Sequence, residues 1–205
     1  MPTFEEDIVE SYYNIQGYFT IKNIQFSAVK KRPGGRGRGE IDLLAIKPNK
    51  KGLILDAIHI EVSVGIVYEF PFIDKHYAST DEVRRLLKKF FQNDSDKKIE
   101  EYLGKFKCRS VCVTSDFGKR TVDKIKERLD ELKVDRFKII RNGPSKIDVD
   151  ILYLKKHKIL ELIPFRYIID DLVRFLKEKR LLTKDFQNQS LAAMQHFIRL
   201  NKKTE

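Results

Sequence analysis

The sequence predicts an α/β protein with a mixed central sheet flanked by helices (a restriction-endonuclease-like arrangement), on the strength of three observations. A helical apolar stripe occupies residues 4–16. Two strand-like apolar runs, over residues 40–47 and 53–64, are joined by the turn-forming segment KPNKKG. From residue 80 onward, helical and strand-like segments alternate. Such an order of elements is typical of helices packed around a mixed sheet.

The N-terminal elements follow from local patterns. Phe4, Ile8 and Tyr12 recur at helical spacing, and Gly17 ends the predicted helix. A first strand is predicted over residues 19–30. The segment KRPGGRGRG that follows is too rich in glycine for a regular element, so we expect a flexible hairpin connection there.

The second half predicts further alternation. One helix is expected over residues 80–103, beginning at a Ser-Thr-Asp start. A strand over 109–114, a helix over 120–133 and a strand over 137–141 form a β-α-β unit. The run KIDVDILYL is a second strand-like segment after the turn at NGPS, and the remainder is expected to be mostly helical.

The length of 205 residues favours one domain with an appendage. We assign residues 1–164 to the α/β domain and residues 165–205 to a helical C-terminal extension. The extension carries a broad apolar stripe that favours packing as core, with a homodimer contact as the alternative. The stripe consists of Ile168, Ile169, Leu172, Val173, Phe175 and Leu176.

The charge balance indicates a polyanionic partner. The chain has 41 Lys and Arg against 30 Asp and Glu, a formal net charge of +11. Such an excess favours binding to nucleic acid, although a charge-rich surface also suits a heat-adapted protein. The sequence has no apolar run long enough to cross a bilayer and an acidic N-terminal MPTFEED. We therefore expect a soluble cytoplasmic protein without a membrane partner.

Several other chemistries are poorly supported. Cys108 and Cys112 are expected to be buried thiols, since no second cysteine pair or histidine lies at a zinc-binding spacing. The glycine-rich KRPGGRGRGE precedes a strand and lacks Gly-Lys-Ser/Thr, so it is not a phosphate-binding loop. The sequence has no local signature of a Ser-His-Asp triad.

Two acids stand where a buried strand would normally carry apolar residues. In GEIDLLAI, the strand period of two places Asp42 on one face with Leu44 and Ile46. In AIHIEVSVG, it places Glu61 with His59 and Ser63. If the two strands form a hairpin, Asp42 and Glu61 converge. Adjacent buried carboxylates repel unless a cation joins them, and Mg²⁺ binds one or two carboxylates, a backbone carbonyl and water.

This combination resembles the PD-(D/E)XK nuclease superfamily, and within it the small endonucleases related to Holliday-junction resolvases. The resemblance rests on a helix bearing glutamate, a glycine break, a strand reading GEIDLLAI and a strand reading IHIEVSV. It covers about residues 4 to 115. It implies hydrolysis of phosphodiester bonds in DNA with Mg²⁺ or Mn²⁺ as cofactor.

The resemblance also implies roles for particular residues. Asp42 corresponds to the metal-bridging aspartate, and Glu61 to the second metal ligand, with the carbonyl of Val62 nearby. Glu6 corresponds to the helix glutamate that completes or supports the metal site. Glu10 lies one turn further along the same helical face and is the alternative match.

The sequence departs from the family at Ser63, where the family places a lysine two residues after the glutamate. That lysine orients the attacking water and stabilises the charged transition state. Without it, catalysis would lose an electrostatic contribution of about 10²-fold or more. Either another cation reaches the site, or the enzyme is slow, or the chain is not an enzyme and its fold serves as a DNA-binding or assembly subunit with a degraded site. The candidates for such a cation are Lys30, Lys75, Arg84 and Lys88.

Basic residues cluster immediately before the first acid. We interpret them as phosphate contacts beside the acids, with a solubilising loop as the alternative. The cluster consists of Lys30, Lys31, Arg32, Arg36 and Arg38.

Overall fold

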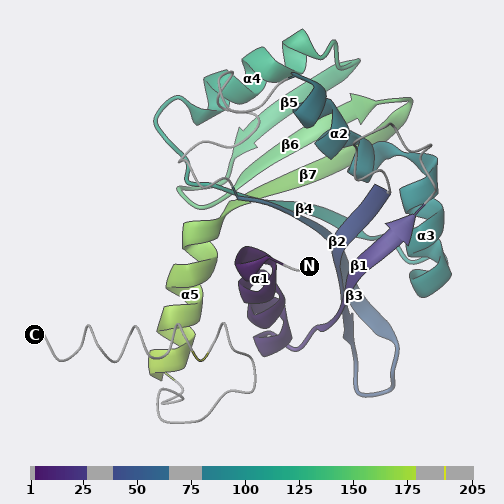
Figure 1. The fold of residues 1–205 in the computed structure, drawn as a ribbon, viewed down its shortest axis with the longest axis vertical. Coiled ribbons are helices and arrows are strands. Elements are labelled where there is room, and N and C mark those ends of the chain that lie inside the picture. Colours follow the sequence, from purple (N-terminus) through teal and green to yellow (C-terminus); the bar gives the residue numbers. More distant parts are fainter. Residues whose placement is uncertain (1–2, 27–38, 65–79, 179–191, 193–205) are drawn as a thin grey trace, which may run out of the picture.

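The computed structural model describes residues 3–26, 39–64, 80–178 and 192. It confirms the α/β class, with a mixed sheet flanked by helices (Figure 1). In chain order the elements are α1 (Phe4–Ile15), β1 (Phe19–Phe26), β2 (Gly39–Pro48), β3 (Ile54–Ser63), α2 (Thr80–Phe91), α3 (Asn93–Leu103), β4 (Arg109–Thr114), α4 (Thr121–Glu131), β5 (Arg136–Arg141), β6 (Ile147–Tyr153), β7 (Lys156–Pro164) and α5 (Phe165–Glu178).

The sheet has seven strands in the order β1-β2-β3-β4-β7-β6-β5. The strands β1, β2 and β3 form an antiparallel meander, whereas β4 runs parallel to both β3 and β7. The strands β5, β6 and β7 pair antiparallel. Because β3 and β4 are parallel, their carboxyl ends lie at the same edge of the sheet.

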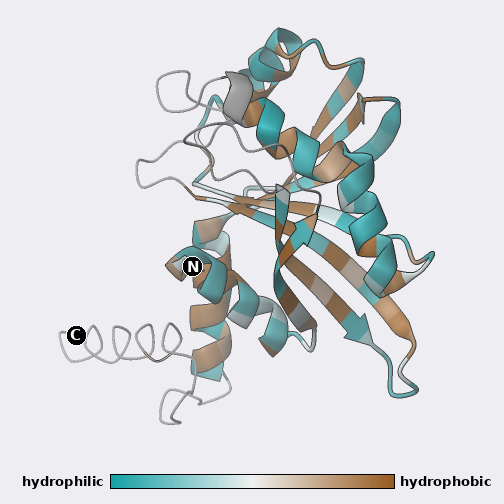
Figure 2. Ribbon diagram, turned by 45° about the vertical axis from the view of Figure 1, so that its right-hand side comes forward, coloured by the Kyte–Doolittle hydropathy of each residue, from teal (hydrophilic) through white to brown (hydrophobic). Residues whose placement is uncertain are grey.

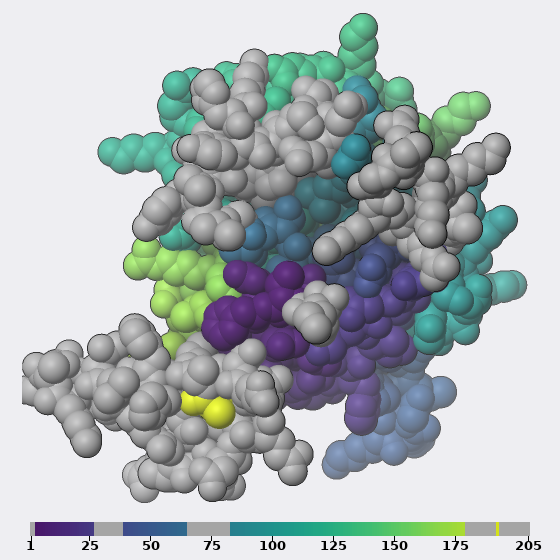
Figure 3. All heavy atoms as spheres, in the orientation of Figure 1, coloured from purple at the N-terminus to yellow at the C-terminus, as the bar shows by residue number. Residues whose placement is uncertain are grey.

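Two helices, α1 and α5, cover one face of the sheet. Helix α1 begins with a capping box, in which Thr3 accepts from the backbone N–H of Glu6 and the Glu6 carboxylate accepts from the N–H of Thr3. In the space-filling view, α1 lies between α5 and the β1–β2 strands (Figure 3). Ile168, Leu172 and Leu176 of α5 are buried in the same core cluster as α1. The apolar stripe of this helix is therefore core packing.

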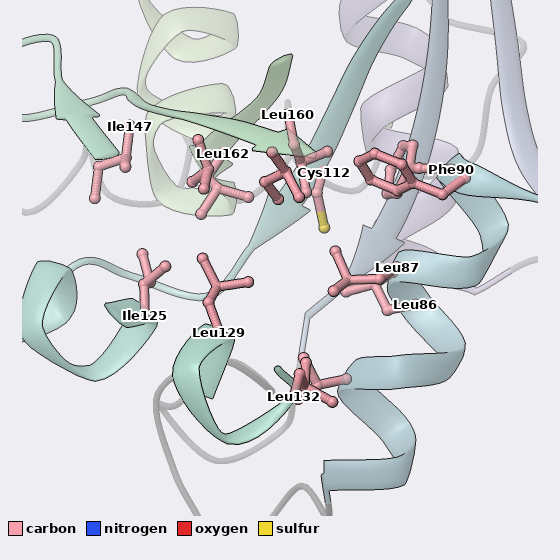
Figure 4. Packing of buried hydrophobic residues seen from close by; sticks show 14 residues of the cluster. Leu86, Leu87, Phe90, Cys112, Ile125, Leu129, Leu132, Ile147, Leu160 and Leu162 are labelled. Atoms are coloured by element: carbon pink, nitrogen blue, oxygen red, sulfur yellow. The ribbon is translucent and has the colours of Figure 1, made fainter. Parts of the chain in front are cut away.

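The opposite face is covered by α2 and α4. Their apolar side chains point toward those of β4, β6 and β7, and Phe90 of α2 lies beside Leu160 of β7 (Figure 4). Helix α3 covers β1 and β2 through Ile99 and Leu103. Brown hydrophobic residues dominate the central strands, while these helices show teal residues on the other side (Figure 2). The sheet thus separates two apolar layers.

The helix expected over residues 80–103 is in fact two helices. Gln92 is extended, with φ −74° and ψ 146°, and is the N-cap residue of α3. The buried hydroxyl of Ser95 donates to the carbonyl of Lys89 at 2.6 Å. A short polar side chain that bonds the preceding backbone favours a new helix start over a continuous helix. The prediction of one helix is therefore wrong at this point.

Strand β7 was not expected, because the sequence after KIDVDILYL was predicted to be mostly helical. The turn before it has two residues with positive φ, Leu154 at 52° and Lys155 at 63°. Two-residue hairpins of this kind usually carry Asn and Gly, so Leu154 and Lys155 are no signal for a turn. The predicted β-α-β unit is also revised: β5 lies at the sheet edge, and β7 is the neighbour of β4.

Candidate functional site

The two strand acids lie opposite each other on adjacent strands. Leu43 of β2 pairs with Ile60 of β3, and this antiparallel register places Asp42 across from Glu61. Asp42 is near the start of β2 and Glu61 near the end of β3, so both lie toward one edge of the sheet. Glu61 is fully buried. The convergence expected from strand alternation is present.

Lys89 of α2 joins the two acids. Its ammonium donates to Oδ1 of Asp42 at 2.9 Å and also to Oε2 of Glu61. Burial works to lower the pKa of Lys89, but the attraction of Glu61 and Asp42 outweighs it, so its pKa lies above the ordinary value. Lys89 is therefore charged and held between two carboxylates.

The charges of this trio do not balance. Burial, reinforced by the negative charge of Glu61, raises the pKa of Asp42 to about 7. Burial also raises the pKa of Glu61, although Lys89 opposes the rise. One ammonium cannot neutralise two buried carboxylates, so a proton or a further cation is favoured at Asp42 near neutral pH.

The backbone also holds Asp42. The N–H of Val62 donates to Oδ2 of Asp42 at 2.9 Å, while Oδ1 accepts from Lys89. The carboxylate orientation is therefore fixed by a strand amide and a helix side chain. A site that holds a carboxylate from two directions keeps its geometry without substrate.

His59 orients Glu61 from within the sheet. Its Nε2 lies 2.7 Å from Oε1 of Glu61, and its ring packs 4.6 Å from that of Phe90, centroid to centroid. Burial lowers the pKa of His59 to about 3, so the ring is neutral. Its Nδ1 is buried and has no hydrogen-bond partner. We assign the proton to Nε2, because an unpartnered acceptor then remains in place of an unpartnered donor and Glu61 stays charged.

The two helix glutamates differ in their surroundings. Burial is the main cause that raises the pKa of Glu6, and the negative charge of Asp42 adds to the rise, so the Glu6 carboxylate, which accepts from the N–H of Thr3, is within electrostatic range of Asp42. The carboxylate of Glu10 instead contacts Lys22 at 2.6 Å and accepts from Thr20 at 3.0 Å. This coupling to Asp42 therefore favours Glu6 over Glu10 as the helix acid of the site.

Ser63 is the last residue of β3 and lies beside Thr114 of β4, at the edge of the sheet where the acids lie. Lys30 and Lys75, two of the candidate cations, lie outside the described residues, as do Lys31, Arg32, Arg36 and Arg38. The cation that does reach the acids, Lys89, was not among the candidates. Arg84 and Lys88, which were, lie on the same helix.

The helical phase of α2 contains a signal that could have included Lys89 among the candidate cations. Its buried residues include Val83, Leu87 and Phe90. At roughly 100° per residue, Arg84, Lys88 and Lys89 flank this stripe, whereas the exposed Arg85 lies opposite it. The sequence could therefore narrow the choice to these three flanking residues, but only the sheet geometry selects Lys89.

The donor set of the acid pair suits a hard divalent cation. Two carboxylates converge on one positive group, and the Val62 carbonyl belongs to the same short stretch of strand. Mg²⁺ commonly takes one or two carboxylates and keeps several waters. No group of three or more His, Cys, Asp or Glu side chains suited to a metal ion occurs within residues 3–26, 39–64 and 80–178. Among the described residues, Asp42 and Glu61 would be the side-chain ligands of such an ion, with the Val62 carbonyl and water beside them.

Comparisons with known proteins leave the family open, since no family model, curated protein or solved structure matches this chain. Among the described helices, none is both long and apolar enough to cross a membrane.

Proposed function

We propose that this chain is a PD-(D/E)XK-type nuclease that hydrolyses phosphodiester bonds in DNA with Mg²⁺ or Mn²⁺. The observation that carries the proposal is the position of Lys89. Its ammonium contacts both Asp42 and Glu61. The family lysine, absent at Ser63, is replaced in this proposal by a lysine from a helix.

The trio has the charge pattern that such chemistry requires. Two carboxylates attract a divalent ion, and a lysine beside them supplies a positive charge for a phosphate group. The pKa of Asp42, raised to about 7, reflects a shortage of positive charge that a divalent ion would relieve. A structural ion pair would not need the second acid.

Each group has a role in the proposed reaction. Asp42, Glu61 and the Val62 carbonyl would hold the ion, which when bound would supply Lewis acidity toward a phosphate oxygen. Lys89 stabilises negative charge on the phosphate, and His59 keeps Glu61 oriented. Glu6 supports the site from α1, and Ser63 offers a hydroxyl to an attacking water.

Charge supports nucleic acid as the substrate. The net charge of +11 favours a polyanion. Arg85 of α2 is exposed and lies one helical turn before Lys89 on the same side of the helix. Lys119 and Arg120 are exposed after the carboxyl end of β4, at the same sheet edge as Ser63. These cations, with Arg36 and Arg38 of the basic segment, are the proposed phosphate contacts.

Cleavage of supercoiled plasmid and of branched DNA junctions tests the proposal. Wild type should cleave one of them with Mg²⁺ or Mn²⁺ and not with EDTA. Asp42→Asn should abolish cleavage while DNA binding persists, because it removes a charged ligand but no phosphate contact. Asp150→Asn, which changes a strand acid paired with His157, is the matched control. Cleavage that survives Asp42→Asn would contradict the proposal.

Binding provides a separate test of the substrate class. Affinity for DNA should fall steeply with salt, and Arg36→Ala with Arg38→Ala should flatten the dependence by about one unit of slope per lost contact. Salt-independent binding would contradict a phosphate-directed interaction.

A second function is favoured by the same lysine. Lys89 occupies the position between the acids and neutralises part of their charge. This arrangement also suits a nuclease fold with a degraded site that serves as a DNA-binding or assembly subunit. Binding of DNA without cleavage of any substrate, and without Mn²⁺ binding at the acids, would favour this alternative.

A further inference from the structure

The end of α2 is held by side chains from two other elements. The last carbonyls of a helix lack partners within it. Here the carbonyl of Lys89 accepts from the hydroxyl of Ser95 at 2.6 Å, and the carbonyl of Phe90 accepts from the ammonium of Lys158 at 2.6 Å. Ser95 belongs to α3 and Lys158 to β7.

The two side chains that hold the end of α2 are themselves held in place. The side chain of Ser95 is fully buried. The ammonium of Lys158 also donates to Oδ1 of Asp96 at 2.6 Å, so the chain that follows α2 is tied to the sheet as well. A cation at the C-terminal end of a helix is favoured by the helix dipole. The two held carbonyls belong to Lys89 and to the residue next to it.

We propose that Ser95 and Lys158 are positioning residues that hold the end of α2 and thereby place the Lys89 ammonium between Asp42 and Glu61. The effect on cleavage rests on the proposed function, whereas the placement of the ammonium does not. A displacement of the helix end by about 1 Å is enough to cost a reaction roughly 10²-fold.

Lys156 provides a matched control for Lys158. It lies two residues earlier on β7, on the same face of the strand, and its ammonium also contacts Asp96. It differs in having no contact with Phe90. Loss of Lys156 removes an ion pair with α3 but no hydrogen bond to α2.

The first experiment observes the ammonium directly. In ¹H–¹⁵N spectra of lysine side chains, the Lys89 signal, identified by its loss in Lys89→Arg, should be protected from exchange in wild type and in Lys156→Met. In Lys158→Met it should broaden or disappear, and Lys158→Arg should retain it. An unchanged Lys89 signal in Lys158→Met would overturn the proposal whether or not the protein cleaves DNA.

The second experiment measures the consequence for cleavage. Lys158→Met should lower kcat about ten-fold with little change in KM, and Lys158→Arg should recover most of the loss. In the Lys89→Met background, Lys158→Met should add no further loss, because Lys158 acts through Lys89. Additive losses would assign Lys158 a general structural role and overturn the proposal.

If Lys158→Met does not fold, Ser95→Ala tests the same positioning of the Lys89 ammonium. It should broaden the same signal and lower kcat in the same non-additive way. If wild type does not cleave DNA but the Lys89 signal still depends on Lys158, the proposed nuclease function is contradicted. The positioning of Lys89 by Lys158 is then still supported.

Discussion

The two ends of β3 carry acids in opposite electrostatic states. At one end, Asp56 accepts from Nε and Nη2 of Arg109, at 3.1 and 2.6 Å, and from the hydroxyl of Tyr18 at 2.7 Å. Burial opposes ionisation there, but these hydrogen bonds outweigh it, and the pKa of Asp56 lies below its ordinary value. At the other end, Glu61 shares one lysine with Asp42, and the pKa values of both acids are raised.

The difference lies in the balance of charge. Asp56 meets a full cation in a bidentate geometry that suits a carboxylate. The pair of Asp42 and Glu61 meets one cation for two negative charges. The first cluster is satisfied without a ligand, and the second is not. Both ends carry acids and an ion pair, so neither feature alone distinguishes the candidate site. The end with Asp42 and Glu61 differs in lacking a second positive charge.

The largest effect should come from removing each cation in turn. Lys89→Met should lower cleavage by about 10²- to 10³-fold, because the phosphate loses its stabilising charge. Arg109→Met should leave cleavage nearly unchanged and reduce the free energy of unfolding. Single-turnover rates and urea denaturation of both variants measure this contrast. Equal losses of cleavage in Lys89→Met and Arg109→Met would contradict a role in cleavage that is specific to Lys89.

A second test moves the cation to the strand. In the Lys89→Met background, Ser63→Lys should recover cleavage by about ten-fold, because it restores a positive charge at the edge where the acids lie. In wild type, the same change should alter the rate only slightly, since Lys89 already contacts both acids. Ser63→Arg is the control for charge without lysine geometry. A large gain in wild type would show that Lys89 does not fill the role.

The pH dependence of stability should differ in sign between the two ends. The pKa of Asp42 rises from 3.8 to about 7, so its contribution to stability is present at low pH and is lost as pH rises toward 7. Asp42→Asn should therefore gain up to about 4 kcal/mol relative to wild type on going from pH 4 to pH 8 in EDTA, because a pKa change of one unit is worth about 1.4 kcal/mol. Urea denaturation at both pH values measures this gain.

Asp56 provides the control for this experiment. Because its pKa is lowered, its contribution is present near neutral pH and is lost in acid. Asp56→Asn should therefore be most destabilising near pH 7 and lose its effect as pH falls below the ordinary range of a carboxyl group. Parallel pH profiles for the two variants would contradict the assignment of opposite states.

The smallest effect concerns the helix acids. Glu6→Gln should lower cleavage by only a few-fold, because Glu6 lies near the acids without contacting Lys89. Glu10→Gln should leave cleavage unchanged, since Glu10 is paired with Lys22. The ratio of kcat values for the two variants measures the difference. A larger loss from Glu10→Gln would reverse the assignment.

Local patterns predicted the elements that carry the acids. Strand alternation placed Asp42 and Glu61 on facing positions, and the turn KPNKKG indicated the hairpin that joins their strands. Lys89 could not be selected in this way, because its approach depends on how α2 crosses the sheet. His59 was assigned to the face of Glu61, but its role depends on burial against Phe90.

The missed elements lack local sequence signals. Gln92 breaks a helix without Gly or Pro, and Leu154 and Lys155 form a tight turn with side chains that seldom adopt positive φ. In both places, tertiary packing overrides local preference. The sequence therefore predicts periodic helices and strands better than the helix boundaries and turns between them.

The position of β7 has a consequence for synthesis of the chain. It lies between β4 and β6, and it pairs Leu160 with Ser110, fifty residues earlier in the sequence. Until residues 156–164 have left the ribosome, the meander of β1 to β3 with β4 and the hairpin strands β5 and β6 have no strand to join them. The late strand therefore makes closure of the sheet a long-range step, and β4 exposes an unpaired edge to other nascent chains until that step is complete.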